Sequence, residues 1–144
     1  MSVVVAIGPS DSAVRQVPDT LEFLAPPPGM LALRHFALEA LDRSGSLFAM
    51  RSTEDDGIRL FVVPPRLYVP GYTPQIDSVS REALGLDGEP PVLLVVVHPG
   101  EEGRPPTANL LAPLAVNPRT GAALQVVLEG DDWPLRAPLG AAAG

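Results

Sequence analysis

The chain has 144 residues and a mass of 15.1 kDa, a size that suits one domain with a substantial hydrophobic core. It contains no cysteine, which excludes disulfides, thiolate nucleophiles and cysteine-ligated zinc sites. Every lysine or arginine position is an arginine. The net charge is −7, so binding to nucleic acid is disfavoured, whereas a basic protein would be attracted. A plainer explanation of the charge is that it keeps the protein soluble.

The amino terminus lacks the pattern of a secretory signal. Residues 3–7 are apolar, but no basic residue precedes them, and Gly8-Pro9 follows. The longest purely apolar run, residues 92–97, is too short to span a bilayer. We therefore expect a cytoplasmic protein without membrane contact, with a single β domain over residues 1–139 and a flexible tail over residues 140–144.

Short β-rich segments alternate with proline clusters along the chain. Proline has no amide donor and a fixed φ, so its 18 occurrences mark strand ends and turns. The apolar patterns between the clusters predict strands at residues 3–7, 20–24, 47–51, 58–63, 92–97, 110–116 and 122–128.

Two turn signals and one uninterrupted apolar run refine this pattern. Asp55-Asp56-Gly57 stands before a β-branched run and predicts a hairpin. Residues 117–121, Asn-Pro-Arg-Thr-Gly, suit a type I turn followed by a left-handed glycine, and therefore a second hairpin. Residues 92–97 are apolar on both faces, which predicts a central strand.

One short helix is expected near residues 78–84. Asp77, Ser78 or Ser80 can cap its start, and Gly85 or Gly88 can end it. Residues 30–41 are ambiguous, because helix-forming residues and near-helical spacing favour a helix when the segment is considered alone. The remaining elements predict an all-β, mainly antiparallel fold, a compact barrel-like or sandwich structure.

The sequence offers no catalytic constellation. His35 and His98 stand apart from any metal-binding spacing, so packed or strand-end positions explain them better than a ligand or base role. Adjacent carboxylates on a strand point to opposite faces, so Asp55-Asp56 and Asp131-Asp132 are not expected to converge as a dyad. Glu101-Glu102 suits a solvated loop. Neither a phosphate-binding glycine loop nor a nucleophile elbow is present, and we expect no cofactor and no metal.

Polar side chains inside the apolar runs of residues 107–128 need hydrogen-bond partners if they are buried. Asn109 and Gln125 are expected to tie neighbouring strands together through their amides, and direct contact with a partner is the alternative. Tyr68, Tyr72 and Trp133 are aromatic residues with polar atoms. Core packing is the default for each, and an anchor in a protein interface is the alternative.

Residues 109–113, Asn-Leu-Leu-Ala-Pro, are the most specific piece of a pattern that resembles the FliW family of flagellar assembly factors. Asn109, Ala112, Pro113, Asn117 and Gln125 form the part of the family motif found here. The resemblance extends from about residue 17 to 139. It includes residues 17–23, 36–38, 47–52 and 60–65, Gly71-Tyr72, and Trp133 where a tyrosine often stands.

The chain departs from the family pattern at three places. The turn that usually reads Gly-Leu-Pro-Gly-aromatic keeps Pro28-Gly29, but Pro26 replaces a glycine and Met30 replaces the aromatic residue. Pro64 stands where the family commonly has an aspartate, so any role of that carboxylate is absent.

The resemblance implies a compact barrel-like β fold, with a strand around residues 34–38. It also implies two protein partners, flagellin and the basic RNA-binding regulator CsrA, which would exchange on the protein without covalent chemistry. Tyr68, Tyr72, Glu101, Glu102, Asp131, Asp132 and Trp133 are the expected partner-binding residues. We expect a monomer when the protein is free. The alternative is a small β-barrel ligand-binding domain or enzyme of unknown substrate.

Overall fold

The computed structural model describes residues 2–6, 14–24, 34–42, 45–55, 57–69, 72, 74–86, 88, 90–98, 103, 106–128, 133, 134 and 136–138. The expected flexible tail, residues 140–144, lies outside these residues. Strands dominate the described part, as predicted, and are β1 Ser2–Ala6, β2 Val14–Pro18, β3 Thr20–Phe23, β4 His35–Ala40, β5 Phe48–Ser52, β6 Arg59–Val63, β7 Val92–His98, β8 Thr107–Ala108, β9 Leu114–Val116, β10 Ala122–Gln125 and β11 Ala137–Pro138.

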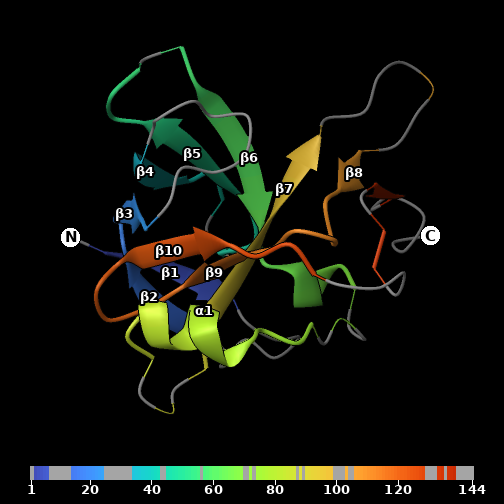
Figure 1. The fold of residues 1–144 in the computed structure, drawn as a ribbon. Helices are drawn as coiled ribbons and strands as arrows, with labels where there is room; N and C mark the ends of the chain where they lie inside the picture. Colours follow the sequence, from blue (N-terminus) through green and yellow to red (C-terminus); the bar gives the residue numbers. More distant parts are fainter. Residues whose placement is uncertain are drawn as a thin grey trace.

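Seven of these strands close into a barrel (Figure 1). Antiparallel pairs lead from β3 through β4, β5 and β6 to β7. β7 also pairs with β9, β9 pairs with β10, and β10 returns to β3 in a parallel pair. The predicted all-β, barrel-like, mainly antiparallel fold is therefore confirmed. Closure satisfies the backbone groups that an open sheet would leave unpaired at its edges.

The predicted central strand is confirmed, because β7 pairs with three neighbours. It pairs with β6 along one edge, and with β9 and β8 at different positions along the other. β8 then pairs with β11, so a small extension of the sheet branches from the barrel at the carboxyl end of β7. β1 and β2 form a separate two-stranded hairpin.

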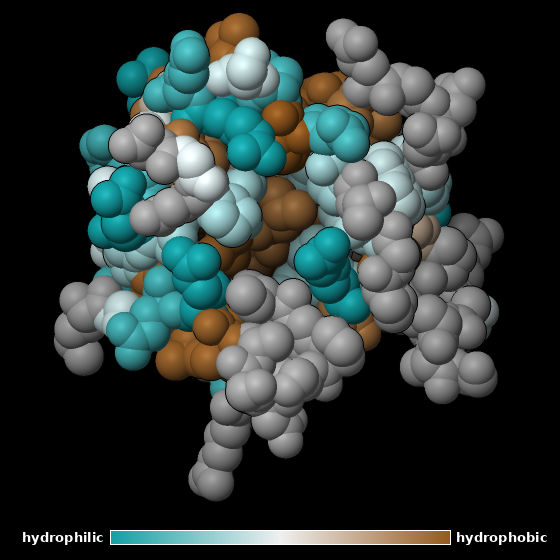
Figure 2. Space-filling model, turned by 90° about the horizontal axis from the view of Figure 1, so that it is seen from below, coloured by the Kyte–Doolittle hydropathy of each residue, from teal (hydrophilic) through white to brown (hydrophobic). Residues whose placement is uncertain are grey.

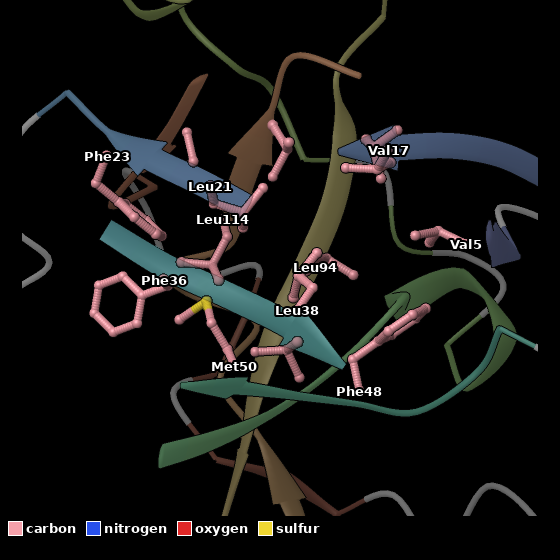
Figure 3. Packing of buried hydrophobic residues seen from close by; sticks show 14 residues of the cluster. Val5, Val17, Leu21, Phe23, Phe36, Leu38, Phe48, Met50, Leu94 and Leu114 are labelled. Atoms are coloured by element: carbon pink, nitrogen blue, oxygen red, sulfur yellow. The ribbon is translucent and has the colours of Figure 1, made fainter. Parts of the chain in front are cut away.

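The barrel interior is filled by side chains that alternate inward along the strands. Figure 3 shows residues from β3, β4, β5, β7 and β9 meeting there. Leu21, Leu94 and Met50 are each 0 % exposed. The rings of Phe23 and Phe36 meet edge to face, with their centroids 5.4 Å apart. A small barrel packed in this way has a core where a larger barrel would have a ligand chamber.

Residues 35–40 are a strand, so the strand implied by the resemblance is confirmed and the helical alternative is wrong. Phe36 and Leu38 point into the core, whereas Glu39 and Ala40 are exposed. The helix propensities of ordinary residues differ from one another by only roughly a few tenths of a kcal/mol per residue. Burying two large apolar side chains contributes about 1.5–3 kcal/mol each, and only the strand aims both inward.

The predicted helix is confirmed as α1, Ser78–Ala83, which lies at the lower end of the barrel in Figure 1. Asp77 is its N-cap, and its carboxylate accepts a hydrogen bond from the backbone N–H of Ser80. Leu84 is the C-cap, and Gly85 follows at a φ of 74°. None of the described helices is long and apolar enough to cross a membrane.

Both predicted hairpins are confirmed. β5 and β6 pair around residues 55–57, with Arg51 opposite Arg59. β9 and β10 pair around residues 117–121, where Gly121 has a φ of 82° and donates its N–H to the carbonyl of Asn117 at 2.9 Å.

The predicted strands around the second hairpin are too long. Only residues 114–116 and 122–125 are strands, whereas residues 110–116 and 122–128 were expected. Asn109 and Ala112 close a turn that overlaps the start of the first segment, where the regular strand pairing is absent. The backbone beyond β10 still bonds to it, from Val126 N to the Pro113 carbonyl and from Leu128 N to that of Leu111.

Candidate functional site

A cleft of about 340 Å³ opens beside α1, where prolines and arginines from distant parts of the chain meet. We call it the arginine cleft, and its described lining residues are Arg15, Pro64, Pro65, Arg66, Tyr72, Pro74, Ile76, Arg81, Pro90, Pro91, Val92 and Leu93. Figure 2, which views the molecule from below, shows a hollow with a hydrophobic interior between hydrophilic side chains. The volume falls at the lower end of the range of ligand-binding pockets, roughly 300–1,000 Å³.

Prolines shape the walls of the cleft. Pro64 and Pro65 end the extended run of β6 and begin the 3₁₀ turn η1, Pro65–Leu67. Pro90 and Pro91 stand immediately before β7. Because proline cannot pair in a sheet interior, each pair stops the sheet and turns the chain outward at the same end of the barrel.

Two of the arginines are oriented by carbonyl groups of the same wall. Arg66 lies on η1, and its Nε donates to the carbonyl of Tyr72 at 3.4 Å. Arg81 lies on α1, and its Nε donates to the carbonyl of Ile76 at 3.2 Å. Arg15 reaches the cleft from β2. Three positive groups therefore border an apolar hollow in a protein whose net charge is −7.

Sequence reasoning missed this cleft. The proline clusters were interpreted only as strand ends, and the arginines are separated by up to 66 positions of chain, from 15 to 81. One signal was available, because Arg66 directly follows Pro64-Pro65 and such a turn holds its side chain at the surface. The three arginines meet only where β2, η1 and α1 line one cleft of the folded chain, which no local sequence pattern specifies.

The structure separates the three aromatic candidates. Tyr72 is 0 % exposed, and its hydroxyl donates to the carbonyl of Leu110 at 2.6 Å. Burial raises the pKa of that hydroxyl above its ordinary value. The expectation that Tyr72 contacts a partner directly is therefore corrected: its side chain is part of the core.

Tyr68 and Trp133 are half-buried and pack against the hydrophobic cluster that contains Tyr72. The Tyr68 hydroxyl donates to the carbonyl of Ser46 at 2.9 Å. Trp133 meets Tyr72 edge to face, with the ring centroids 4.7 Å apart. Both side chains therefore pack against buried residues and remain partly exposed to solvent. Aromatic residues that anchor protein interfaces commonly have this arrangement.

The residues of the Asn109–Pro113 motif organise the backbone. Asn109 donates its N–H to the carbonyl of Val96 on β7, at 2.9 Å. Its side-chain oxygen accepts from Ala112 N at 3.1 Å, inside its own turn. The expectation that the Asn109 amide joins neighbouring strands is therefore corrected, because the backbone makes that link. Ala112 and Pro113 are buried.

Gln125 and Asn117 do connect separate segments. Gln125 donates through Nε2 to the carbonyl of Ala112 at 3.1 Å. Asn117, which is 1 % exposed, donates through Nδ2 to the carbonyls of Leu84 at 2.9 Å and Gly85 at 3.4 Å. Its Oδ1 accepts from Arg119 N at 2.9 Å. The β9–β10 hairpin is thus hydrogen-bonded to the end of α1, the helix that carries Arg81 of the arginine cleft.

The four acidic residues expected to bind a partner, Glu101, Glu102, Asp131 and Asp132, lie outside the described residues. Trp133 is described and adjoins the second pair in sequence.

His35 has carboxylate partners that the sequence analysis did not assign. Its ring hydrogen-bonds to Glu54 through Nδ1, and to Glu22 through Nε2 at 3.1 Å. The hydrogen bond to Glu54, followed by that to Glu22, raises the pKa of His35 above its ordinary value. The group joins β3, β4 and the residues after β5 on the outside of the barrel. Within the described residues, no group of three or more histidine or acidic side chains is arranged to hold a metal ion.

Comparisons with known proteins agree with this architecture. A model of the protein family described as FliW protein matches residues 8–139. Flagellar assembly factor FliW of Thermotoga neapolitana is 33 % identical over 111 residues, which cover 76 % of this chain and 74 % of the relative. The Bacillus subtilis protein of the same description is 30 % identical over 117 residues, 78 % of this chain and 80 % of that protein.

A solved structure supports the fold separately. The crystal structure of a flagellar assembly factor FliW superposes with a TM-score of 0.77 and covers 96 % of both chains, at 22 % sequence identity. A likeness at this identity concerns the path of the backbone rather than individual site residues.

Proposed function

The chain belongs to the FliW family, and from that premise we propose that it serves flagellum assembly in the cytoplasm as a binding protein without enzymatic activity. The observation that carries the proposal is the family match over residues 8–139. The filled barrel interior adds physical support, because it provides a stiff scaffold rather than a chamber for a small substrate.

The proposed partners are flagellin and a CsrA-type RNA-binding regulator. Flagellin that accumulates in the cell occupies the protein, the regulator is released, and translation of flagellin falls. Secretion of flagellin frees the protein to hold the regulator again. Two binding events that weaken each other are sufficient for this switch, and thermodynamic linkage makes the effect reciprocal.

Charge supports an encounter with the basic regulator. The net charge of −7 includes Glu101, Glu102, Asp131 and Asp132, which we propose as part of the surface that steers the regulator. Trp133 follows the second acidic pair, keeps part of its surface exposed and is braced by Tyr72. Two acidic residues followed in sequence by a braced aromatic side chain suit a basic partner.

Competition between the two partners is the first test. The purified protein is mixed with the regulator from the same organism, and flagellin is added in increasing amounts while the complexes are separated by size-exclusion chromatography. Flagellin is expected to displace the regulator. A stable complex of all three proteins would contradict exclusion, and binding to neither partner would overturn the proposed function.

Salt dependence is the second test. The association rate with the regulator is measured between 50 and 300 mM NaCl, chosen because the screening length falls to about 8 Å at physiological salt. A variant with Glu101→Gln, Glu102→Gln, Asp131→Asn and Asp132→Asn is expected to associate more slowly and to lose most of the salt dependence. A wild-type rate that does not change with salt would reject steering.

A further inference from the structure

The arginine cleft is a positive, apolar site on an acidic protein. Arg66 and Arg81 are exposed and Arg15 is half-buried, and each lines the cleft from a different element. None of the three forms a salt bridge with a carboxylate among the described residues. By contrast, Arg51 pairs with Glu39 at 3.3 Å. The positive charge at the cleft is therefore not matched by a described carboxylate of the protein itself.

The walls leave the arginines as the principal donors. Five lining residues are prolines, which have no backbone N–H to offer a ligand. The Nε atoms of Arg66 and Arg81 donate to carbonyls of the wall, which orients each guanidinium. No described residue accepts a hydrogen bond from the Nη groups of these two arginines, so the Nη groups can serve a ligand. Guanidinium forks match carboxylates in a bidentate manner. Ile76, Val92 and Leu93 add aliphatic surface around them.

We propose that the arginine cleft is the docking site for a segment of flagellin that carries carboxylate side chains between aliphatic ones. The assignment rests on the proposed function, and charge decides between its two partners. A basic RNA-binding regulator is repelled by three guanidinium groups, whereas the acid-rich parts of the protein attract it. An acidic, aliphatic segment satisfies both the donors and the apolar walls.

The two partners therefore use surfaces of opposite charge. Binding of one partner then excludes the other because the two bulky proteins overlap in space, or because binding at the cleft is transmitted through the hydrogen bonds that connect the cleft to the rest of the molecule. Asn117 fastens the end of α1, which carries Arg81, to the β9–β10 hairpin. One prediction follows directly: changes in the cleft affect flagellin and spare the regulator.

The test uses the full chain and both partners. Arg66→Gln, Arg81→Gln and the double charge reversal Arg66→Glu with Arg81→Glu are compared with Arg51→Gln, an exposed arginine outside the cleft. Circular dichroism and thermal melting check that each variant is folded, which is expected because Arg66 and Arg81 are exposed. Affinities for flagellin and for the regulator are measured by isothermal titration calorimetry.

Each glutamine variant is expected to bind flagellin about tenfold more weakly, the effect of one lost charged hydrogen bond. The double reversal is expected to weaken binding at least about a hundredfold. Arg51→Gln is expected to bind as the wild type does, and all variants are expected to keep their affinity for the regulator.

Three results would overturn the inference, and they differ in what else they affect. Cleft variants that bind flagellin as tightly as wild type reject the docking site and leave the proposed function intact. Cleft variants that lose the regulator but keep flagellin reverse the assignment. A wild-type protein that ignores flagellin overturns the docking site together with the proposed function.

Discussion

Replacing Gly121 by alanine tests how tightly the barrel closes between β3 and β10. Gly121 has a φ of 82°, and a Cβ at this position would lie 2.6 Å from the carbonyl oxygen of Thr20 and 3.4 Å from Cβ of Pro18. That oxygen must move by about 0.7 Å to reach the roughly 3.3 Å of a close C–H···O contact. The nearest of these neighbours is a backbone atom rather than the end of a flexible side chain, and Glu22 N donates to the Gly121 carbonyl at 3.0 Å. The clash therefore strains the parallel pair that closes the barrel.

Gly88 provides the matched control. Its φ is also 82°, but a Cβ there meets nothing within 4 Å. Gly88→Ala is expected to cost about 1 kcal/mol, because left-handed strain of roughly 1–2 kcal/mol is partly offset by a less flexible unfolded chain. Gly121→Ala adds the displacement of packed backbone and the weakening of about one hydrogen bond, which brings the loss to roughly 3–5 kcal/mol.

Urea unfolding measures both values. The fluorescence of Trp133, the single tryptophan, reports the transition, since the ring rests on buried Tyr72. Comparable slopes in urea would show that the variants unfold from similar native states. If Gly121→Ala unfolds in water, Gly121→Asn replaces it, because asparagine tolerates the left-handed region and retains the Cβ. Equal losses at positions 121 and 88 would refute the conclusion that β3 and β10 are in close contact.

Three further predictions concern buried or paired polar groups. Asn117→Ala is expected to lower the free energy of unfolding by about 2–4 kcal/mol, because it removes the hydrogen bonds to Leu84 and Arg119 and leaves the buried Leu84 carbonyl without this donor. Thermal melting checks this, and a loss below about 0.5 kcal/mol would contradict it. Tyr72→Phe is expected to cost about 1–2 kcal/mol, since the Leu110 carbonyl loses its donor in the core, and urea unfolding that is unchanged from wild type would disagree. The pKa of His35 is raised, and the pKa of Glu54 is lowered, chiefly by the hydrogen bond between them. This pair is therefore predicted to stabilise the fold most at mildly acidic pH. The His35 contribution is fully present below its unfolded pKa of about 6.5 and is lost as the pH rises through its folded value, whereas the Glu54 contribution is lost as the pH falls through the lowered pKa of that group. An NMR titration should place the His35 midpoint above 6.5 and move it down in Glu54→Gln, and a midpoint unaffected by that change would rule out the pairing.

The sequence determined much of this protein through local patterns. Alternating apolar residues, turn glycines and an N-cap each act within a few residues, so β1, β3, β5, β6 and β7, the hairpins at residues 55–57 and 117–121, and α1 were predictable. The strands β2, β8 and β11 were not predicted. The Asn109–Pro113 motif was sufficient to suggest the family. The acidic composition also suggested a basic partner, which remains a proposal.

Tertiary structure decided the features that depend on distant segments. Residues 35–40 form a strand because this conformation buries Phe36 and Leu38 in the barrel core. The free energy of burying these two side chains outweighs a modest helix preference. Tyr72 was assigned to the core only by packing, because a tyrosine suits a core and an interface equally well. The arginine cleft arose because the tertiary fold brings β2, η1 and α1 to one cleft, and no local pattern specifies which side chains of distant segments meet there.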